Sequence, residues 1–190
     1  MEKQNLEKFN NKIIIISGVA GSGKGSVWSV LRKYPEKFCI SISYTSRKPR
    51  EGEINGFDYN FISEKEFDQA VKNNEFLEWE QVHLDKYGTK KFDFEQIIAS
   101  DKIPILELDV NGEKQILKKY DNIISIFITT PSTEEAMERL KLRGSEDRKS
   151  YEKRVSRYKM EMECAKNYDH IIVNDNLDRA QKELLTILSI

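Results

Sequence analysis

The hydrophobic and polar positions of this chain form short apolar runs separated by stretches with helical character. Nearly unbroken apolar runs of this length predict strands that are buried on both faces. Residues 13–16 form such a run, 103–110 is another candidate, and strands are also predicted at 37–44, 123–129 and 170–173. The stretch 178–188 predicts an amphipathic closing helix. Apolar strands that alternate with helices predict a parallel sheet covered on both faces.

The stretch from about 45 to 90 has a different pattern, with short strands and many charged residues. Residues 63–66 have the spacing of a capping box and predict a helix that ends near Asn73. Alternating positions predict a strand over 75–82, and residues 86–89 predict a turn. This stretch is therefore expected to be an insertion into the sheet-and-helix pattern.

A glycine-rich turn at 18–24 follows the first strand, and a helix is predicted over about 24–32. Glycine allows a backbone with positive φ that brings several N–H groups close to one phosphate, and Lys24 adds a full charge. This order predicts a phosphate-binding loop, although a turn that binds nothing is the alternative. The pattern usually has a hydroxyl that contacts Mg²⁺ at residue 25, whereas this chain has Gly25 and then Ser26.

Two carboxylates, Glu107 and Asp109, come at the end of the predicted strand 103–110. Their spacing of two predicts that they share one face of that strand. A carboxylate beside a phosphate loop can hold Mg²⁺ directly or through water, and we expect Asp109 to meet residues 18–24 there. Ordinary polar residues where a strand leaves the core are the alternative.

Arginines flank a polar break at 144–149. Arg139 and Arg143 share one helix face, and Arg154 and Arg157 share a face of the next helix. Guanidinium groups on a lid could stabilise the charge of a phosphoryl group in transfer. Spacing alone favours the other reading, which is a solvated helix face with local acidic partners.

The segment 45–59 has two arginines around Pro49, with glycines and several charges. A segment of this composition is either a solvated turn or a clamp for an anion. Charge alone leaves these two readings even.

The bulk properties narrow the class of protein. The chain has 190 residues and 22.2 kDa, enough for one domain with a full core. With 31 basic and 32 acidic residues its net charge is −1, which argues against a general nucleic-acid or membrane-surface binder. Cys39 and Cys164 are far apart and are expected to be free thiols. The sequence contains no predicted signal peptide or membrane span, so we expect a cytoplasmic protein.

Taken together, these motifs resemble those of guanylate kinase over roughly residues 12–188. The matching stretches are SGVAGSGKG (17–25), SYTSRKPREGEINGFDY (43–59), EFLEWEQV with YGT (75–89), ELDVNG (107–112), PSTEEAMERLKLRG (131–144) and IIVNDN (171–176). The stretch around Arg47 and Arg50 is specific to the family, whereas a phosphate loop alone is not.

The resemblance implies an α/β fold in a single guanylate-kinase-like domain. A P-loop core with a five-stranded parallel sheet flanked by helices would comprise about 12–42, 91–138 and 159–190. A GMP-binding insert with short strands would comprise about 43–90, and a helical lid about 139–158. The implied reaction is Mg²⁺-dependent, in-line transfer of the γ-phosphoryl group of ATP to GMP, and also to dGMP, which gives ADP and GDP.

The resemblance also assigns residues by motif. ATP would be bound by Gly18, Val19, Ala20, Gly21, Ser22, Gly23, Lys24, Gly25, Ser26 and Asn174. The GMP phosphate would be held by Arg47, Arg50, Tyr59 and Tyr87, and the guanine would be read by Ser43, Glu78 and Thr89. Glu53 and Glu107 complete the GMP site. The catalytic residues would be Lys24, Arg139, Arg143 and Arg154, and Asp109 would hold Mg²⁺ through water.

Two alternatives remain at this level. One is a guanylate-kinase-like module that binds phosphorylated peptides without catalysis. The other is a kinase of the same fold that acts on another phosphorylated substrate. For the leading hypothesis the expected partners are ATP and GMP, without nucleic acid or membrane, in a monomer or homodimer.

Overall fold

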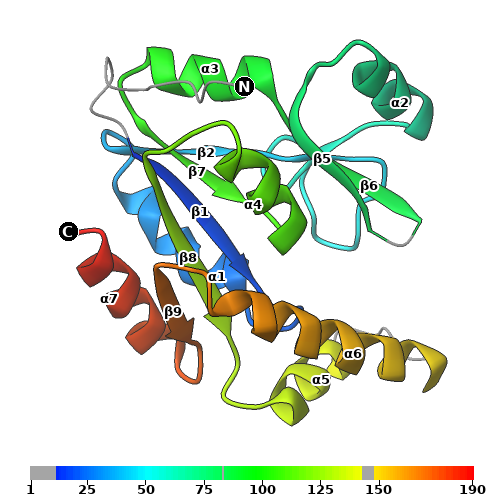
Figure 1. Ribbon diagram of the computed structural model, residues 1–190, viewed down its shortest axis with the longest axis vertical. Helices are drawn as coiled ribbons and strands as arrows, with labels where there is room; N and C mark the ends of the chain where they lie inside the picture. The colour runs from blue at the N-terminus through cyan, green and yellow to red at the C-terminus, as the bar shows by residue number, and fades with distance from the viewer. Residues whose placement is uncertain (1–11, 83, 143–147) are drawn as a thin grey trace. The chain divides into compact units, whose positions relative to one another are not determined.

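The computed structural model (Figure 1) describes residues 12–82, 84–142 and 148–190. The chain divides into two compact units. One contains Glu36–Ile123 together with the first part of strand β1, and the other contains Ile16–Pro35 and Ile124–Ile190.

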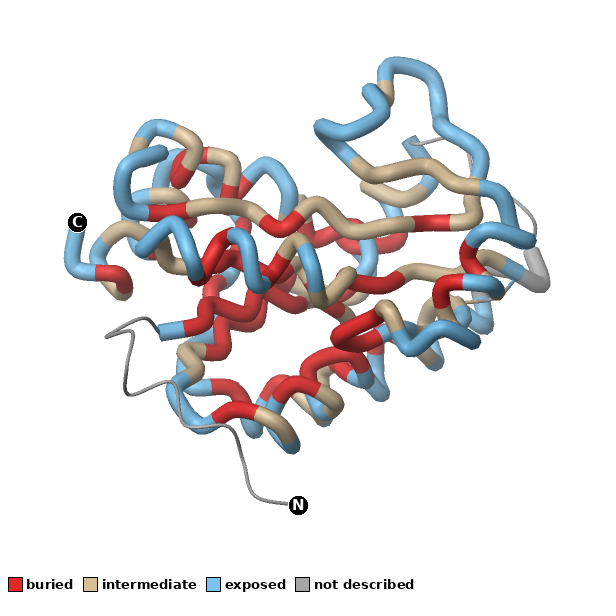
Figure 2. Tube along the Cα trace, turned by 90° about the horizontal axis from the view of Figure 1, so that it is seen from above, coloured by how far each residue is buried: buried red, intermediate tan, exposed pale blue. Residues whose placement is uncertain are grey.

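The main sheet has five strands in the order β2-β7-β1-β8-β9, which confirms the predicted five-stranded parallel sheet. Its strands are β1 (Ile13–Gly18), β2 (Phe38–Ser41), β7 (Ile103–Glu107), β8 (Ile123–Thr129) and β9 (His170–Val173). Ile13 to Ile16 are each at most 1% exposed, as their apolar run predicts. In Figure 2 buried positions gather in the interior of the trace, and exposed positions lie mainly on its outer turns.

A second sheet forms from the charged stretch of the first unit, in the order β4-β3-β6-β5. Its strands are β3 (Tyr44–Thr45), β4 (Asn60–Phe61), β5 (Phe76–Val82) and β6 (Asp85–Lys90). The strand predicted over 37–44 is therefore wrong beyond Ser41, because Tyr44 already belongs to the second sheet. β5 and β6 pair antiparallel, with Glu78 opposite Thr89.

The turn predicted at 86–89 is wrong, because these residues form the middle of β6. The glycine that suggested a turn is needed for a close approach between strands. A Cβ on Gly88 would lie 2.9 Å from the Glu78 carbonyl oxygen and 2.9 Å from the Trp79 Cβ. The pairing of β5 and β6 shifts register in this region, between Phe76 and Glu78. Gly88 is therefore explained by the close approach of β5 and β6 and not by a turn.

Helix α2 (Glu64–Lys72) begins with the predicted capping box. The Ser63 hydroxyl accepts from the Glu66 N–H at 3.2 Å, and the Glu66 carboxylate accepts from the Ser63 N–H at 2.7 Å. The helix packs on the second sheet through Phe67, whose ring stacks on that of Phe76 with centroids 4.4 Å apart. Lys86 of β6 also forms ion pairs with two carboxylates of α2, those of Glu64 and Asp68.

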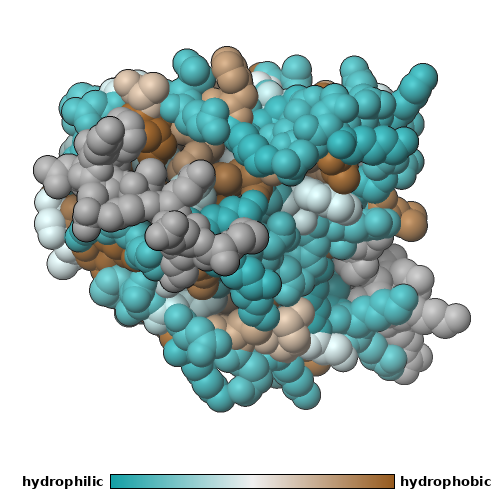
Figure 3. Space-filling view, turned by 45° about the horizontal axis from the view of Figure 1, so that its top comes forward, coloured by the Kyte–Doolittle hydropathy of each residue, from teal (hydrophilic) through white to brown (hydrophobic). Residues whose placement is uncertain are grey.

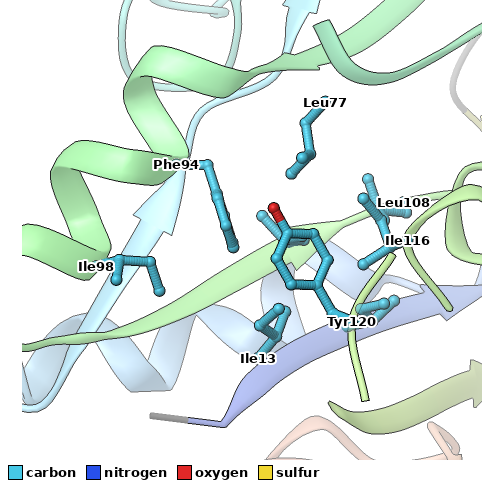
Figure 4. Packing of buried hydrophobic residues seen from close by; sticks show 9 residues of the cluster. Ile13, Leu77, Phe94, Ile98, Leu108, Ile116 and Tyr120 are labelled. Atoms are coloured by element: carbon cyan, nitrogen blue, oxygen red, sulfur yellow. The ribbon is translucent and has the colours of Figure 1, made fainter. Parts of the chain in front are cut away.

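The core of the first unit lies between β1, β5, β7 and the helices α3 (Lys91–Ala99) and α4 (Val110–Leu117). Its buried members are Ile13, Ile15, Leu77, Phe94, Ile98, Leu106, Leu108, Ile116 and Tyr120 (Figure 4). The rings of Phe94 and Tyr120 are 5.4 Å apart. The core therefore joins a strand of the second sheet, through Leu77, to strands of the main sheet.

The second unit contains α1 (Lys24–Trp28), a 3-10 segment η2 (Ser29–Lys33), α5 (Thr133–Leu142), α6 (Arg148–Ala165) and α7 (Leu177–Ile187). The helix predicted over 24–32 is therefore confirmed, although its second half is 3-10. Helix α7 packs against α1. None of the helices within the described ranges is both long and apolar enough to cross a bilayer. Hydrophilic residues predominate on the face in Figure 3.

Candidate active site

The turn after β1 has the backbone of a phosphate-binding loop. Gly21 and Gly23 have φ of 85° and 76°, in the left-handed region that favours glycine. Both glycines are also closely packed. A Cβ on Gly21 would lie 2.6 Å from the Ala136 carbonyl oxygen, and a Cβ on Gly23 would lie 2.8 Å from the Asn174 Nδ2. The Lys24 Nζ donates to the Gly18 carbonyl at 3.1 Å, which holds the ammonium group over the loop.

Two hydroxyl groups lie on the loop and on the turn of helix after it. The Ser22 hydroxyl is buried and has no hydrogen-bond partner among the described residues. A buried donor of this kind fits a ligand with acceptor oxygens. Ser26 is exposed, and its backbone carbonyl accepts from the Gln181 Nε2 at 2.8 Å. A Cβ at Gly25 would have open space around it.

Asn174, which follows β9, braces the loop from a distant part of the chain. It is 6% exposed, and its Nδ2 donates to the Ser22 carbonyl at 2.7 Å. The Asn174 carbonyl accepts from the Arg139 Nη2 at 2.9 Å, and the same guanidinium pairs with Glu135. The structure therefore brings together Arg139, Asn174 and the loop, which sequence reasoning had assigned separately.

The other predicted arginines of this unit have different positions. Arg143 lies outside the described residues. Arg154 is on α6 with intermediate exposure. Arg157, which no motif singled out, donates from Nε to the buried Glu161 carboxylate at 2.8 Å. Its spacing of four from Glu161 was the signal in the sequence for this pair.

In the first unit, Arg47 is the centre of a cluster on the loop after β3. Its Nη1 and Nη2 donate to the two Glu53 carboxylate oxygens, each at 2.8 Å. Its Nη1 also donates to the Lys48 carbonyl at 2.8 Å, and its Nε donates to the Tyr87 hydroxyl at 3.2 Å. Four of the five guanidinium N–H donors are thus occupied, which fixes the plane of the group. The Arg50 N–H completes the cluster by donating to Glu53 at 2.7 Å.

The charges of this cluster are mutually stabilised. Hydrogen bonds from Arg47 lower the pKa of Glu53. Burial alone would lower the pKa of Arg47, but the hydrogen bonds to Glu53 and Tyr87 raise it overall. The Tyr59 ring lies 5.3 Å from the Arg47 guanidinium. Burial, with smaller contributions from Glu107 and other neighbours, raises the pKa of Tyr59, so its phenol stays a hydrogen-bond donor.

Glu78 is a buried carboxylate on β5, 5% exposed. Burial raises its pKa to about 7. Hydrogen bonding by the neighbouring Thr89 opposes this rise, and the negative charge of Asp109 adds to it. The Thr89 hydroxyl is buried and lacks a hydrogen bond of good geometry among the described residues. On the other side, the Glu78 Oε2 lies 2.7 Å from the point where a Cβ of residue 112 would be, so only glycine fits there. Ser43 is half-buried, and its carbonyl accepts from the Asn60 N–H at 2.9 Å.

The prediction that Glu107 and Asp109 share a strand face is wrong, because β7 ends at Glu107. Asp109 is instead the N-cap of α4, where its Oδ1 accepts from the N–H groups of Asn111 at 3.1 Å and Gly112 at 2.8 Å. The short polar side chain competes with the strand for backbone hydrogen bonds and begins a helix. No group of three potential metal ligands occurs within the residues that the structure describes.

Sequence reasoning missed a row of polar contacts from α4 to β5. The Asn111 Nδ2 donates to the Glu80 Oε1 at 2.6 Å, and Gln115 pairs with the backbone of Trp79. Lys119, just after the helix, donates to the Leu77 carbonyl. The signal present in the sequence was the spacing of four between Asn111, Gln115 and Lys119, which places them on one face of a helix.

Comparison with known proteins gives a consistent result. A sequence model described as guanylate kinase matches residues 10–190. The guanylate kinase of Helicobacter pylori is 40% identical over 92% of this chain and 85% of its own length. That of Malacoplasma penetrans is 41% identical over 99% of this chain and 96% of its own. The crystal structure of guanylate kinase from Anaplasma phagocytophilum aligns with a TM-score of 0.76, at 26% identity, over 94% of this chain and 85% of that one.

Proposed function

Because this chain belongs to the guanylate kinase family, we propose that it transfers the γ-phosphoryl group of ATP to GMP, and to dGMP, and releases ADP and GDP. The observation that carries this proposal is the buried Glu78 opposite Thr89, in the same unit as the Arg47 cluster. A site for a nucleoside monophosphate requires a polar group that recognises the base and cationic groups that bind the phosphate, and Glu78 and the Arg47 cluster supply these two.

The GMP phosphate is bound by Arg47, Arg50, Tyr59 and Tyr87. Arg47 is already oriented by Glu53 and Tyr87, so little side-chain freedom is lost when an anion binds. Glu53 therefore acts through Arg47 and not as a contact to the substrate. Glu107 affects the same site through its charge, which favours the protonated phenol of Tyr59.

The guanine base is read by Glu78, Ser43 and Thr89. An ionised Glu78 accepts from both N1–H and the 2-amino group, which adenine does not offer in that arrangement. The buried Thr89 hydroxyl, without another partner of good geometry among the described residues, is available to donate to O6. Substrates that leave these buried groups unpaired are rejected strongly.

ATP is bound by the loop of residues 18–26 and by Lys24, with Asn174 holding the loop in shape. Lys24 and the arginines of α5 and α6, Arg139 and Arg154, stabilise charge on the phosphoryl group as the GMP phosphate attacks in line. Arg143 is assigned the same task from its motif. Catalysis is then positioning and charge neutralisation, without a covalent intermediate.

Mg²⁺ supplies further charge neutralisation on the phosphates when it is bound. This ion is held in proteins by one or two carboxylates with nucleotide oxygens and waters. Asp109 is the carboxylate assigned to hold the ion through water; its Oδ1 accepts from the N–H groups of Asn111 and Gly112, which fixes the orientation of the side chain. The Ser26 hydroxyl, on the exposed first turn of α1, is the second candidate.

The test is a coupled assay of ADP release with GMP, dGMP, AMP, CMP and UMP. We expect turnover with GMP and dGMP only. Equal turnover of AMP or UMP would refute the role of Glu78 and favour a kinase with another substrate.

Calorimetry of ATP with the wild type and with Lys24→Ala tests the donor site. Absence of binding to the wild type would favour the non-catalytic module. Cys39 and Cys164 form no disulfide within the described residues, which fits a reducing compartment such as the cytoplasm.

A further inference from the structure

The residues before and after Glu78 are both held by side chains of α4 and of the turn that follows it. β5 is an edge strand of the second sheet, with β6 on one side only. On its other side the Gln115 Nε2 donates to the Trp79 carbonyl at 2.9 Å, and the Gln115 Oε1 accepts from the Trp79 N–H at 3.4 Å. One side-chain amide thus pairs with both backbone groups of the residue after Glu78.

The residue before Glu78 is held in the same way. Lys119 donates from Nζ to the Leu77 carbonyl, and burial lowers the pKa of this ammonium group, which the Glu78 charge partly opposes. The Leu77 side chain is buried in the core cluster with Ile116 of α4 (Figure 4). Leu77 and Trp79 therefore both depend on α4 and the turn after it for their position.

The Glu78 carboxylate itself lies against the first turn of the same helix. Its Oε2 is 2.7 Å from where a Cβ of Gly112 would stand, and the Gly112 N–H is bound by the N-cap Asp109. Asn111 of this turn also donates to Glu80. Helix α4 thus determines both the backbone around Glu78 and the space that its carboxylate occupies.

We propose that Gln115 is a positioning residue for guanine recognition, which acts by fixing the β5 backbone at Trp79 so that Glu78 faces the base. This inference rests on the proposed function. A carboxylate that must accept from two donors of one base requires a defined orientation, and a small displacement loses one of the two hydrogen bonds.

The test uses Gln115→Ala in steady-state assays with GMP and IMP, since IMP keeps N1–H and lacks the 2-amino group. We expect the KM for GMP to rise about tenfold and the preference for GMP over IMP to fall, with the KM for ATP unchanged. In Gln115→Glu the ionised side chain can accept from the Trp79 N–H but cannot donate to the Trp79 carbonyl. We therefore expect this variant also to differ from the wild type in its KM for GMP.

Ile116→Val is the matched control, because it removes one buried methyl group from the same helix and leaves the Trp79 contacts in place. It should lower the melting temperature without changing the GMP to IMP preference.

Equal losses of activity with GMP and IMP in Gln115→Ala, or a change in melting temperature alone, would overturn the inference. Gln115→Met, which keeps a side chain of similar length and removes both polar contacts with Trp79, decides the question if Gln115→Ala does not fold, and the same loss of GMP to IMP preference is expected. A wild type without GMP turnover or binding would instead overturn the proposed function, and the inference with it.

Discussion

Arg47 and Glu53 form a two-point ion pair in which both nitrogen–oxygen distances are 2.8 Å. The pair is largely covered by the protein, with 10% of the Arg47 side chain and 18% of the Glu53 side chain exposed. Its geometry orients the guanidinium before any substrate binds. In the proposed phosphate site, this orientation reduces the side-chain freedom that Arg47 loses when an anion binds.

Replacing Glu53 by Gln should weaken the two hydrogen bonds that hold the Nη1 and Nη2 groups of Arg47 in place. We expect the KM for GMP to rise about tenfold, with a smaller effect on the KM for ATP, because the arginine loses a charge-assisted partner. Steady-state kinetics measure both values. Glu51→Gln, an exposed position on the same loop, is the control and should leave both unchanged.

The raised pKa of Glu78 predicts a pH dependence of GMP binding. In the proposed site the ionised carboxylate is the form that accepts from guanine, so affinity should fall as the pH drops below about 7. Calorimetry between pH 6 and 8 measures this change, together with proton release on binding. The GMP phosphate titrates in the same range, with a pKa of about 6. Glu78→Gln keeps that titration, so an equally steep profile in this variant would contradict the assignment to Glu78.

The same pKa has a consequence for stability, with a defined sign. Because the pKa of Glu78 is higher in the folded protein than in the unfolded chain, the folded state binds the proton more tightly. This contribution to stability is fully present at a pH below the pKa of Glu78 in the unfolded chain, which is about 4.5. It is lost as the pH rises through about 7, the pKa in the folded protein. Glu78→Gln should therefore show a flatter dependence of the melting temperature on pH between about 4.5 and 7.

Two glycines of the phosphate loop should respond oppositely to substitution. Gly25→Ser has open space and should be tolerated, with a stability gain of about 0.5 kcal/mol from helix propensity. Its hydroxyl should also lower the Mg²⁺ concentration needed for half-maximal activity. Thermal unfolding and a magnesium titration of ADP release test both points, and unchanged magnesium dependence would argue against a ligand at residue 25.

Gly23→Ser should be severely impaired, because φ at Gly23 is 76° and a Cβ would lie 2.8 Å from the Asn174 amide nitrogen. The backbone alone costs about 1–2 kcal/mol for an L-residue in this region. ATP binding by calorimetry should be lost or strongly weakened. Equal behaviour of the variants at residues 23 and 25 would contradict the loop geometry.

Asn174→Ala should weaken ATP binding without affecting GMP. It leaves the buried Ser22 carbonyl without its donor, which costs about 1–3 kcal/mol. The KM for ATP and the melting temperature measure the two effects. Asn167→Ala, at an exposed position after α6, serves as the control. A rise in the KM for GMP of similar size would refute a role confined to the loop.

The parts of this protein that follow from local patterns could be predicted from sequence. The run Ile13 to Ile16 is buried on both faces of a sheet, which requires an apolar residue at every position. Gly88 could not be interpreted in this way, because a turn and a close strand pair both favour glycine. Asp109 was misplaced because an N-cap and a strand end look alike when an acidic residue follows an apolar run. The contact between Arg139 and the Asn174 carbonyl joins residues 35 positions apart and had no local signal beyond the family motifs.

The contact of Gln115 with Trp79 also bears on how this chain behaves in a crowded solution. An edge strand with open N–H and C=O groups is a template for pairing with another chain. The Gln115 amide occupies both backbone groups of Trp79, and Lys119 occupies the Leu77 carbonyl. Loss of these side chains would expose an aggregation-prone edge along β5, so Gln115 would serve both protection against self-association and recognition of the base.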